Sequence, residues 1–209
     1  MGPGRRLRSA VLGAVLASVV AIGVFHYATS AAPRSVGTAS IAVRVPDGER
    51  LQRVGRSGPD AADGVLPGAV SVFSNAYAGI TRLNPRMLAA LRRAATEARR
   101  YGIAIDADSG WRSRAYQEEL FDQAVAQYGS AEAAARWVAR PGTSIHEAGD
   151  AVDIAGADAE AWLWRNGAAY GLCRMYGNEA WHFEWRPAAV ADGCPAMYVD
   201  PTHDPRLGK

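Results

Sequence analysis

Apolar residues recur at helical spacing in the stretch that begins at Asn84-Pro85. Asn followed by Pro is typical of a helix start, because Asn caps free backbone N–H groups and Pro fits the first turn. Leu91 and Ala98 then lie on one apolar stripe with a period of 3.6 residues, and Gly102 ends the pattern. We therefore predict an amphipathic helix that packs this stripe against a core.

Polar capping residues mark three further helices. Ser113 precedes a helix whose buried face includes Phe121 and which Gly129 ends. Ser130 precedes a short Ala-rich helix, and Asp158 precedes a helix that carries Trp162 and Leu163. We expect all three to pack around a common core.

Alternation of apolar and polar positions predicts strands between these helices. Residues 103–108 and 151–155 are predicted to form single strands. Residues 172–176 and 180–185 are predicted to form a hairpin that turns at Gly177-Asn178. We predict an α+β fold, in which helices flank a small antiparallel sheet.

Two of the predicted strands carry a polar residue opposite their apolar face. Asp153 lies opposite Val152 and Ile154, because successive side chains point to opposite faces of a strand. His182 likewise lies opposite the tryptophan-rich face that begins at Trp181, which we expect to be core. Asp153 and His182 are therefore candidates for functional residues at one edge of the sheet.

The N-terminal segment has the three parts of an export signal. Arg5, Arg6 and Arg8 precede an apolar run that ends at Phe25, and small residues follow. We predict an export signal or membrane anchor at residues 1–32, a flexible linker at 33–64 and one domain at 65–209. The protein is then extracytoplasmic, either secreted or held at the outer face of the cytoplasmic membrane, and touches the membrane only through this segment.

Charge and cysteine content narrow the possible partners. The net charge of +2 disappears without the three N-terminal arginines, because 20 basic residues then face 21 acidic ones. There is no basic face to favour nucleic acid, and we expect a monomer. Cys173 and Cys194 fit a disulfide in an oxidising compartment, with two free thiols, or Cys173 as a metal ligand, as the alternatives.

Two histidines and an aspartate form a candidate metal site. His146 lies seven residues before Asp153, and His182 follows on a neighbouring predicted strand. Two imidazoles and one carboxylate leave a fourth position of a tetrahedral Zn²⁺ open, which is the mark of a catalytic site. Iron(II) is the alternative metal, because a facial triad has the same composition.

Glu179 and Arg112 add acid–base and electrostatic chemistry to this site. Glu179 stands three residues before His182, at the predicted turn, where it can take a proton from an attacking water and pass it to a leaving amine. Arg112 follows a predicted strand and can stabilise a developing oxyanion, although it can also pair structurally with Asp106 or Asp108. Together with the candidate metal site, Glu179 and Arg112 predict a hydrolase.

Three motifs resemble those of the zinc D-alanyl-D-alanine carboxypeptidases, which include the vancomycin-resistance D,D-carboxypeptidases and D,D-dipeptidases. They occur in the order and approximate spacing of that family: Ser109-Gly110-Trp111-Arg112-Ser113, Ser144-x-His146-x-x-Gly149-x-Ala151-x-Asp153 and Glu179-x-Trp181-His182.

The resemblance implies His146, Asp153 and His182 as zinc ligands, Glu179 as the catalytic base and Arg112 as the group that polarises the substrate carbonyl. It also implies that Ser144 and Gln117 line the substrate pocket. The expected activity is removal of the terminal D-Ala from peptidoglycan stem peptides. The alternatives are a related peptidoglycan L,D-endopeptidase and a zinc-binding module of the cell wall that binds or signals without turnover.

Overall fold

The computed structural model describes residues 58–208. The predicted export segment and most of the predicted linker lie outside these residues, so both remain predictions. Within the described part of the chain, no helix combines the length and the apolar character that a membrane crossing needs. A 3-10 helix, η1 (Ala61–Asp63), lies near the start of the described segment, and the backbone carbonyl of Asp63 accepts a hydrogen bond from the N–H of Ser113 at 2.8 Å.

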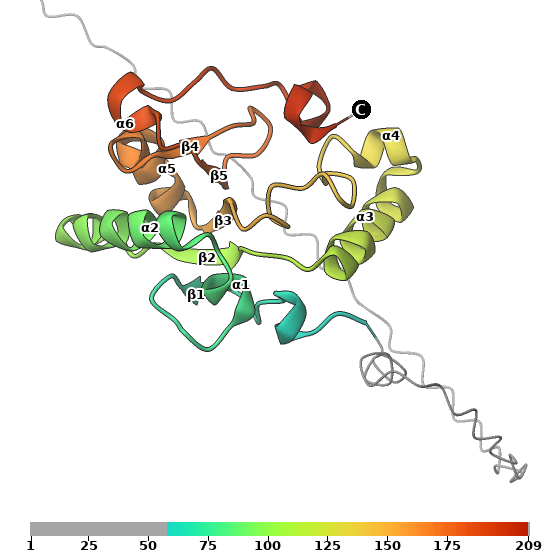
Figure 1. Cartoon of the computed structure of the whole chain (residues 1–209), viewed down its shortest axis with the longest axis horizontal. Helices are drawn as coiled ribbons and strands as arrows, with labels where there is room; N and C mark the ends of the chain where they lie inside the picture. Colours follow the sequence, from blue (N-terminus) through green and yellow to red (C-terminus); the bar gives the residue numbers. More distant parts are fainter. Residues whose placement is uncertain (1–57, 209) are drawn as a thin grey trace, which may run out of the picture. The chain divides into compact units, whose positions relative to one another are not determined.

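A five-stranded antiparallel sheet organises the domain (Figure 1). Its spatial order is β1-β2-β3-β5-β4, so the last two strands of the chain form a hairpin whose second strand pairs with β3. The strands are short: β1 (Val70–Ser71), β2 (Asp106–Ser109), β3 (Ala151–Ala155), β4 (Leu172–Arg174) and β5 (His182–Trp185).

Helices surround this sheet, as the α+β prediction requires. Two of them, α2 and α3, are long, and the other elements are short. The helices are α1 (Ala78–Thr81), α2 (Pro85–Ala98), α3 (Arg114–Tyr128), α4 (Ala131–Ala134), α5 (Ala157–Asn166) and α6 (Ala189–Asp192), with 3-10 turns η2 (Arg99–Tyr101), η3 (Gly167–Tyr170), η4 (Pro201–His203) and η5 (Pro205–Leu207). The predicted α+β fold is confirmed.

The main core lies between one face of the sheet and the helices α2 and α5. Val152, Ile154 and Phe183 point to this face and are at most 1% exposed. The stripe of α2 packs on them, and its residues Leu91 and Ala98 are fully buried. Apolar burial is worth roughly 25 cal/mol per Å². The packing of this face against the helices therefore determines that the opposite face of β3 and β5 carries the polar residues.

Helices α3 and α4 form a separate group with their own small cluster around Phe121 and Ala134. In Figure 1 they lie to the right of the sheet, and the C-terminal segment ends close to α4. Arg136, just after α4, pairs with the buried Asp200 of that segment at 3.0 Å. This ion pair therefore joins the α3–α4 group to the C-terminal segment beside the sheet.

Most predicted element starts are confirmed, and two details are wrong. Asn84, Ser113 and Ser130 all accept backbone N–H groups at the starts of their helices. Gly156, not Asp158, is the N-cap of α5, so Asp158 lies inside the first turn, where an acidic side chain suits the helix dipole. Trp181 was predicted to lie in the core, but it is 39% exposed and precedes β5. It therefore lies outside the core.

The glycine of the second motif, Gly149, has a steric role. Its φ is +76°, and a Cβ there would lie 2.7 Å from the carbonyl oxygen of Arg82. The Gly149 carbonyl also accepts from the N–H of Asn84 at 2.9 Å. The loop that carries His146 is therefore pressed against the start of α2, and only glycine fits at this contact.

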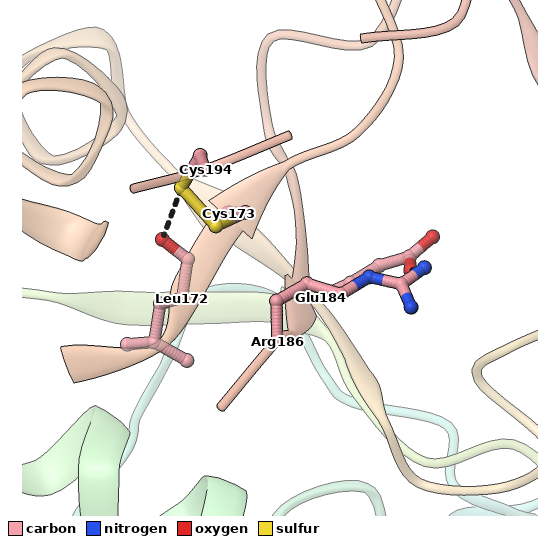
Figure 2. The surroundings of a disulfide bond; sticks show 5 residues. All are labelled: Leu172, Cys173, Glu184, Arg186 and Cys194. Atoms are coloured by element: carbon pink, nitrogen blue, oxygen red, sulfur yellow. Dashed lines mark hydrogen bonds and ion pairs between the residues drawn. A yellow bond between two sulfur atoms is a disulfide. The ribbon is translucent and has the colours of Figure 1, made fainter. Parts of the chain in front are cut away.

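A disulfide joins Cys173 on β4 to Cys194 in the C-terminal segment (Figure 2). Cys173 is fully buried in a third cluster, and Cys194 is on the surface. The predicted bridge is confirmed, and it anchors the C-terminal segment at the point where that segment leaves the sheet.

Removing this bridge should destabilise the domain while leaving its packing almost unchanged. The bridge spans 21 residues, and in the chain-entropy model a loop of this size contributes about 3 kcal/mol. We expect a reductant to lower the free energy of unfolding of the wild-type protein by about that amount in urea titrations. The Cys194→Ser variant should start at the lower value and should not respond to the reductant. Equal stabilities in all four measurements would contradict the prediction.

Candidate metal centre

Strand pairing brings Asp153 and His182 together. The two residues are directly opposite each other in the β3–β5 ladder, so their side chains leave the sheet on the same face. His146 reaches them from the loop before β3. All three residues are buried, with exposed fractions of 4–8%. Residues 36 positions apart along the chain thus share one small volume.

The spacing of their donor atoms fits a single metal ion. Nε2 of His146 lies 3.2 Å from Nδ1 of His182 and 3.4 Å from Oδ1 of Asp153. Nδ1 of His182 lies 3.1 Å from the same Oδ1. Ligands on a tetrahedral zinc with bonds of about 2.0–2.1 Å are roughly 3.3 Å apart. The three donors therefore already have the separations of three corners of a zinc tetrahedron.

The second nitrogen of each ring faces an acceptor. Nδ1 of His146 donates to the carbonyl oxygen of Gly110 at 2.8 Å. Nε2 of His182 faces Oε1 of Glu184 at 3.4 Å. A ring nitrogen that donates a hydrogen bond leaves the opposite nitrogen with its lone pair, which is the arrangement that ligating histidines show. Both lone pairs are then directed at the shared space.

The electrostatics of the cluster favour a cation. Burial alone would lower the pKa of His182, but hydrogen bonds with the carboxylates of Asp153 and Glu184 raise it to about 10. Burial opposes ionisation of Asp153, yet the two imidazoles and Arg112 hold its pKa well below its usual range. Without a metal, a proton on His182 compensates the buried negative charge. A divalent ion provides this compensation more completely.

Arg112 is fixed beside the ligands. Its Nη2 donates to Oδ2 of Asp153 at 2.6 Å, on the oxygen that does not face the histidines. Its Nε donates to Oγ of Ser109 at 2.8 Å, and its Nη1 donates to Oε1 of Gln117 at 3.2 Å. Arg112 pairs with Asp153, and not with Asp106 or Asp108 as the structural alternative supposed. Its charge is thus held in place at the wall of the site.

Glu179 lies in the turn before β5 and points to the same space. Its Oε2 is 3.8 Å from Nδ1 of His182, and its Oε1 has no hydrogen-bond partner among the described residues. Burial raises its pKa to about 7, against the opposing effect of His182. A buried carboxyl that titrates near neutrality, with one free oxygen, is suited to accept and return a proton.

A cavity of about 150 Å³ opens beside these groups. The candidate ligands, Arg112 and Glu179 form its polar wall. Trp137 and Trp181, which are 41% and 39% exposed, contribute aromatic surface. The C-terminal segment completes it with Pro201 and Leu207. The site is therefore a small pocket built from the sheet, the loop before β3 and the end of the chain.

The two remaining predicted site residues, Ser144 and Gln117, lie in the pocket and behind it, respectively. Ser144 is 6% exposed and lines the pocket. Gln117 is fully buried behind Arg112, where its Nε2 donates to the carbonyl oxygen of Ala139 at 2.8 Å. The contact of Gln117 with substrate stays a prediction, while its contact with Arg112 is direct. Sequence reasoning missed Glu184, although it shares a strand face with His182 two residues earlier.

Comparison with known proteins gives a family. The profile of the family "VanY: D-alanyl-D-alanine carboxypeptidase" matches residues 80–188. A D-alanyl-D-alanine carboxypeptidase of Enterococcus faecalis is 35% identical over 113 residues, which cover 42% of this chain and 42% of the relative. The chain thus spans less than half the length of that relative.

Three solved structures are also similar to the chain. A variant of the vancomycin-resistance D,D-pentapeptidase VanY, in complex with Zn(II), is 31% identical and covers 49% of this chain and 72% of that one, with a TM-score of 0.47. VanYB in complex with D-alanine-D-alanine is 30% identical, with shares of 53% and 74% and a TM-score of 0.49. The LD-carboxypeptidase LdcB is 32% identical, with shares of 53% and 70% and a TM-score of 0.47.

The profile covers more than half of the 209 residues, and it includes all of the candidate ligands together with Arg112 and Glu179. The resemblance noted in the three sequence motifs is confirmed, and the chain belongs to the VanY D-alanyl-D-alanine carboxypeptidase family.

Proposed function

We propose that this domain is a zinc-dependent D,D-carboxypeptidase that removes the terminal D-Ala of peptidoglycan stem peptides. The observation that carries the proposal is the triangle of donor atoms from His146, Asp153 and His182, with sides of 3.1–3.4 Å, on the wall of a pocket that also holds Glu179 and Arg112. Family membership supports the reaction, and the small pocket suits a short terminal residue. An extracytoplasmic location fits the family and the disulfide.

The side chains around the pocket divide the chemistry between them. When bound by the three ligands, zinc supplies a Lewis acid that polarises a carbonyl and lowers the pKa of water. Glu179 removes the proton from the attacking water with its free oxygen and returns it to the amine of the departing D-Ala. The charge of Arg112 faces the oxygen on which negative charge develops, and it needs no reorientation because Ser109 and Gln117 hold it.

The first test is release of D-Ala by the metal-loaded protein. We expect a pentapeptide that ends in D-Ala-D-Ala to lose one residue, and a chelator to abolish the reaction until zinc is restored. A tetrapeptide with an L,D terminal bond is the comparison substrate. Faster cleavage of that substrate would replace D,D with L,D specificity, and release that survives complete removal of metal would reject the mechanism.

The second test separates the base from the metal site. We expect Glu179→Gln to keep its zinc but to lower kcat by about 10²–10⁴-fold, because the amide cannot accept the proton. Glu118→Gln is the matched control, since Glu118 is an exposed glutamate of α3 that pairs with the exposed Arg114. Full activity of the Glu179 variant, with zinc bound, would show that this carboxylate is not the base.

The raised pKa of Glu179 also predicts how the stability of the metal-free protein changes with pH. Its carboxyl titrates at about 7 in the fold, against 4.5 without the protein environment. The folded state is thus favoured below pH 4.5 and loses this contribution as the pH rises to 7. Glu179→Gln mimics the neutral form, so its stability relative to wild type should increase between pH 4.5 and 7 and then level off. Urea titrations with a chelator present measure the difference, and a constant offset across this range would contradict the assignment.

A further inference from the structure

Glu184 is a buried carboxylate that the reaction described above does not use. It lies on β5 two residues after His182, on the same face of the strand, and is 1% exposed. A buried carboxylate is unfavourable unless opposite charges and hydrogen bonds compensate it. Its partners therefore indicate why a charge stands at this position.

The two oxygens of Glu184 contact different kinds of groups. Oε1 faces Nε2 of His182 at 3.4 Å and accepts from Nη2 of Arg206 at 3.2 Å. Oε2 accepts from Nη1 of Arg206 at 2.8 Å and from Nη2 of Arg186 at 2.5 Å. Figure 2 shows the side chains of Glu184 and Arg186 extending together, so that the carboxylate and the guanidinium group lie side by side. Arg206 therefore donates to both carboxylate oxygens of Glu184, and Oε1 also faces the imidazole of His182.

Arg206 comes from the C-terminal segment and is itself held. Its guanidinium donates to both carboxylate oxygens of the buried Asp204, through Nε at 2.8 Å and through Nη2. The hydroxyl of Tyr176 donates to Asp204 at 2.9 Å, and the Tyr176 ring stacks on His182 with centroids 5.0 Å apart. The contacts form a closed circuit that starts and ends at His182.

We propose that Glu184 is a positioning residue for the metal site and that Arg206 keeps it in position. By accepting a hydrogen bond from the Nε2–H group, Glu184 fixes the ring of His182 so that the lone pair of Nδ1 faces the donor atoms of His146 and Asp153. The C-terminal segment, which lies outside the matched residues 80–188, thereby supports a ligand of the metal. The inference rests on the proposed function only for the presence of a metal at these ligands.

Replacement of Glu184 by glutamine should weaken the metal site through the orientation of the ring. The single amide oxygen is attracted by the two guanidinium groups, so the NH₂ group is left to face His182 and can no longer accept from Nε2. Loss of such an outer contact typically lowers metal affinity by about 10–100-fold. We expect that decrease in the zinc affinity of Glu184→Gln, measured by competition with a chromogenic chelator.

Arg206→Gln distinguishes positioning from simple electrostatics. Removing a positive charge near a cation site should strengthen zinc binding if only charge matters. If Arg206 acts by holding Glu184, the same change should weaken zinc binding, by about 10-fold. Arg136→Gln is the control, because Arg136 anchors the same C-terminal segment through Asp200 but does not touch Glu184. Its zinc affinity should equal that of the wild type.

A spectroscopic measurement reports on the ring itself. In the zinc-loaded wild type, ¹⁵N NMR of labelled histidine should show His182 bound to the metal through Nδ1, with a slowly exchanging proton on Nε2. We expect that proton to exchange faster in both Glu184→Gln and Arg206→Gln. Because the Arg206 side chain is 28% exposed, its variant tests the proposal even if Glu184→Gln does not fold.

The outcomes separate this inference from the proposed function. Unchanged or tighter zinc binding by Arg206→Gln, with an unchanged Nε2 signal, would overturn the positioning role and leave the peptidase proposal intact. A wild-type protein that binds no zinc at His182 would overturn both. Weaker binding by Glu184→Gln and Arg206→Gln, with Arg136→Gln at the wild-type value, would support the role of the C-terminal segment.

Discussion

The antiparallel pairing of β3 with β5 is the constraint on which the site depends. It places Asp153 opposite His182, while the neighbouring pair, Val152 and Phe183, is buried in the core on the other face. A shift of the register by one residue would turn Asp153 into the core and a hydrophobic residue into the site. The packing that stabilises the domain therefore also fixes the distance between two of the candidate ligands. The position of the third candidate ligand, His146, depends on the close contact of Gly149 with the start of α2.

Around this pair the structure assembles an unusual density of buried charge. Asp153, Glu179 and Glu184 are all at most 8% exposed and all lie within reach of His182. Each carboxylate has a different environment, and the environments give them different capacities. The imidazoles and Arg112 hold the pKa of Asp153 well below its usual range, whereas Glu179 has an oxygen with no hydrogen-bond partner among residues 58–208 and a pKa near neutrality. The proposed roles of Asp153 as a ligand and of Glu179 as a base therefore rest on different environments of the same functional group.

Much of this arrangement could be predicted from the sequence. The cap at Asn84 and the alternation around Asp153 reflect local rules, and both are confirmed in the fold. The three motifs were identified by their resemblance to a family, which the family comparison confirms. Trp181 was assigned to the core because alternation was extended beyond the point where β5 begins, at His182. Likewise, Asp158 satisfied the composition of a cap, but Gly156 occupies that position.

The contribution of the C-terminal segment could not be predicted, because no local pattern links Arg206 to Glu184 or Pro201 to the pocket. These contacts depend on the path of a chain that has little regular structure after α6. The disulfide fixes where this path starts, and the buried Asp200 and Asp204 fix where it returns to the domain. Such polar anchors are visible only once their partners, Arg136 and Tyr176, are placed in space.

The most direct test of this account is anomalous diffraction at the zinc edge from crystals of the metal-loaded protein. The account predicts one strong peak at about 2.0–2.2 Å from Nε2 of His146, Nδ1 of His182 and Oδ1 of Asp153. A peak that involves only one of these residues, or a protein that binds zinc elsewhere, would contradict the central claim.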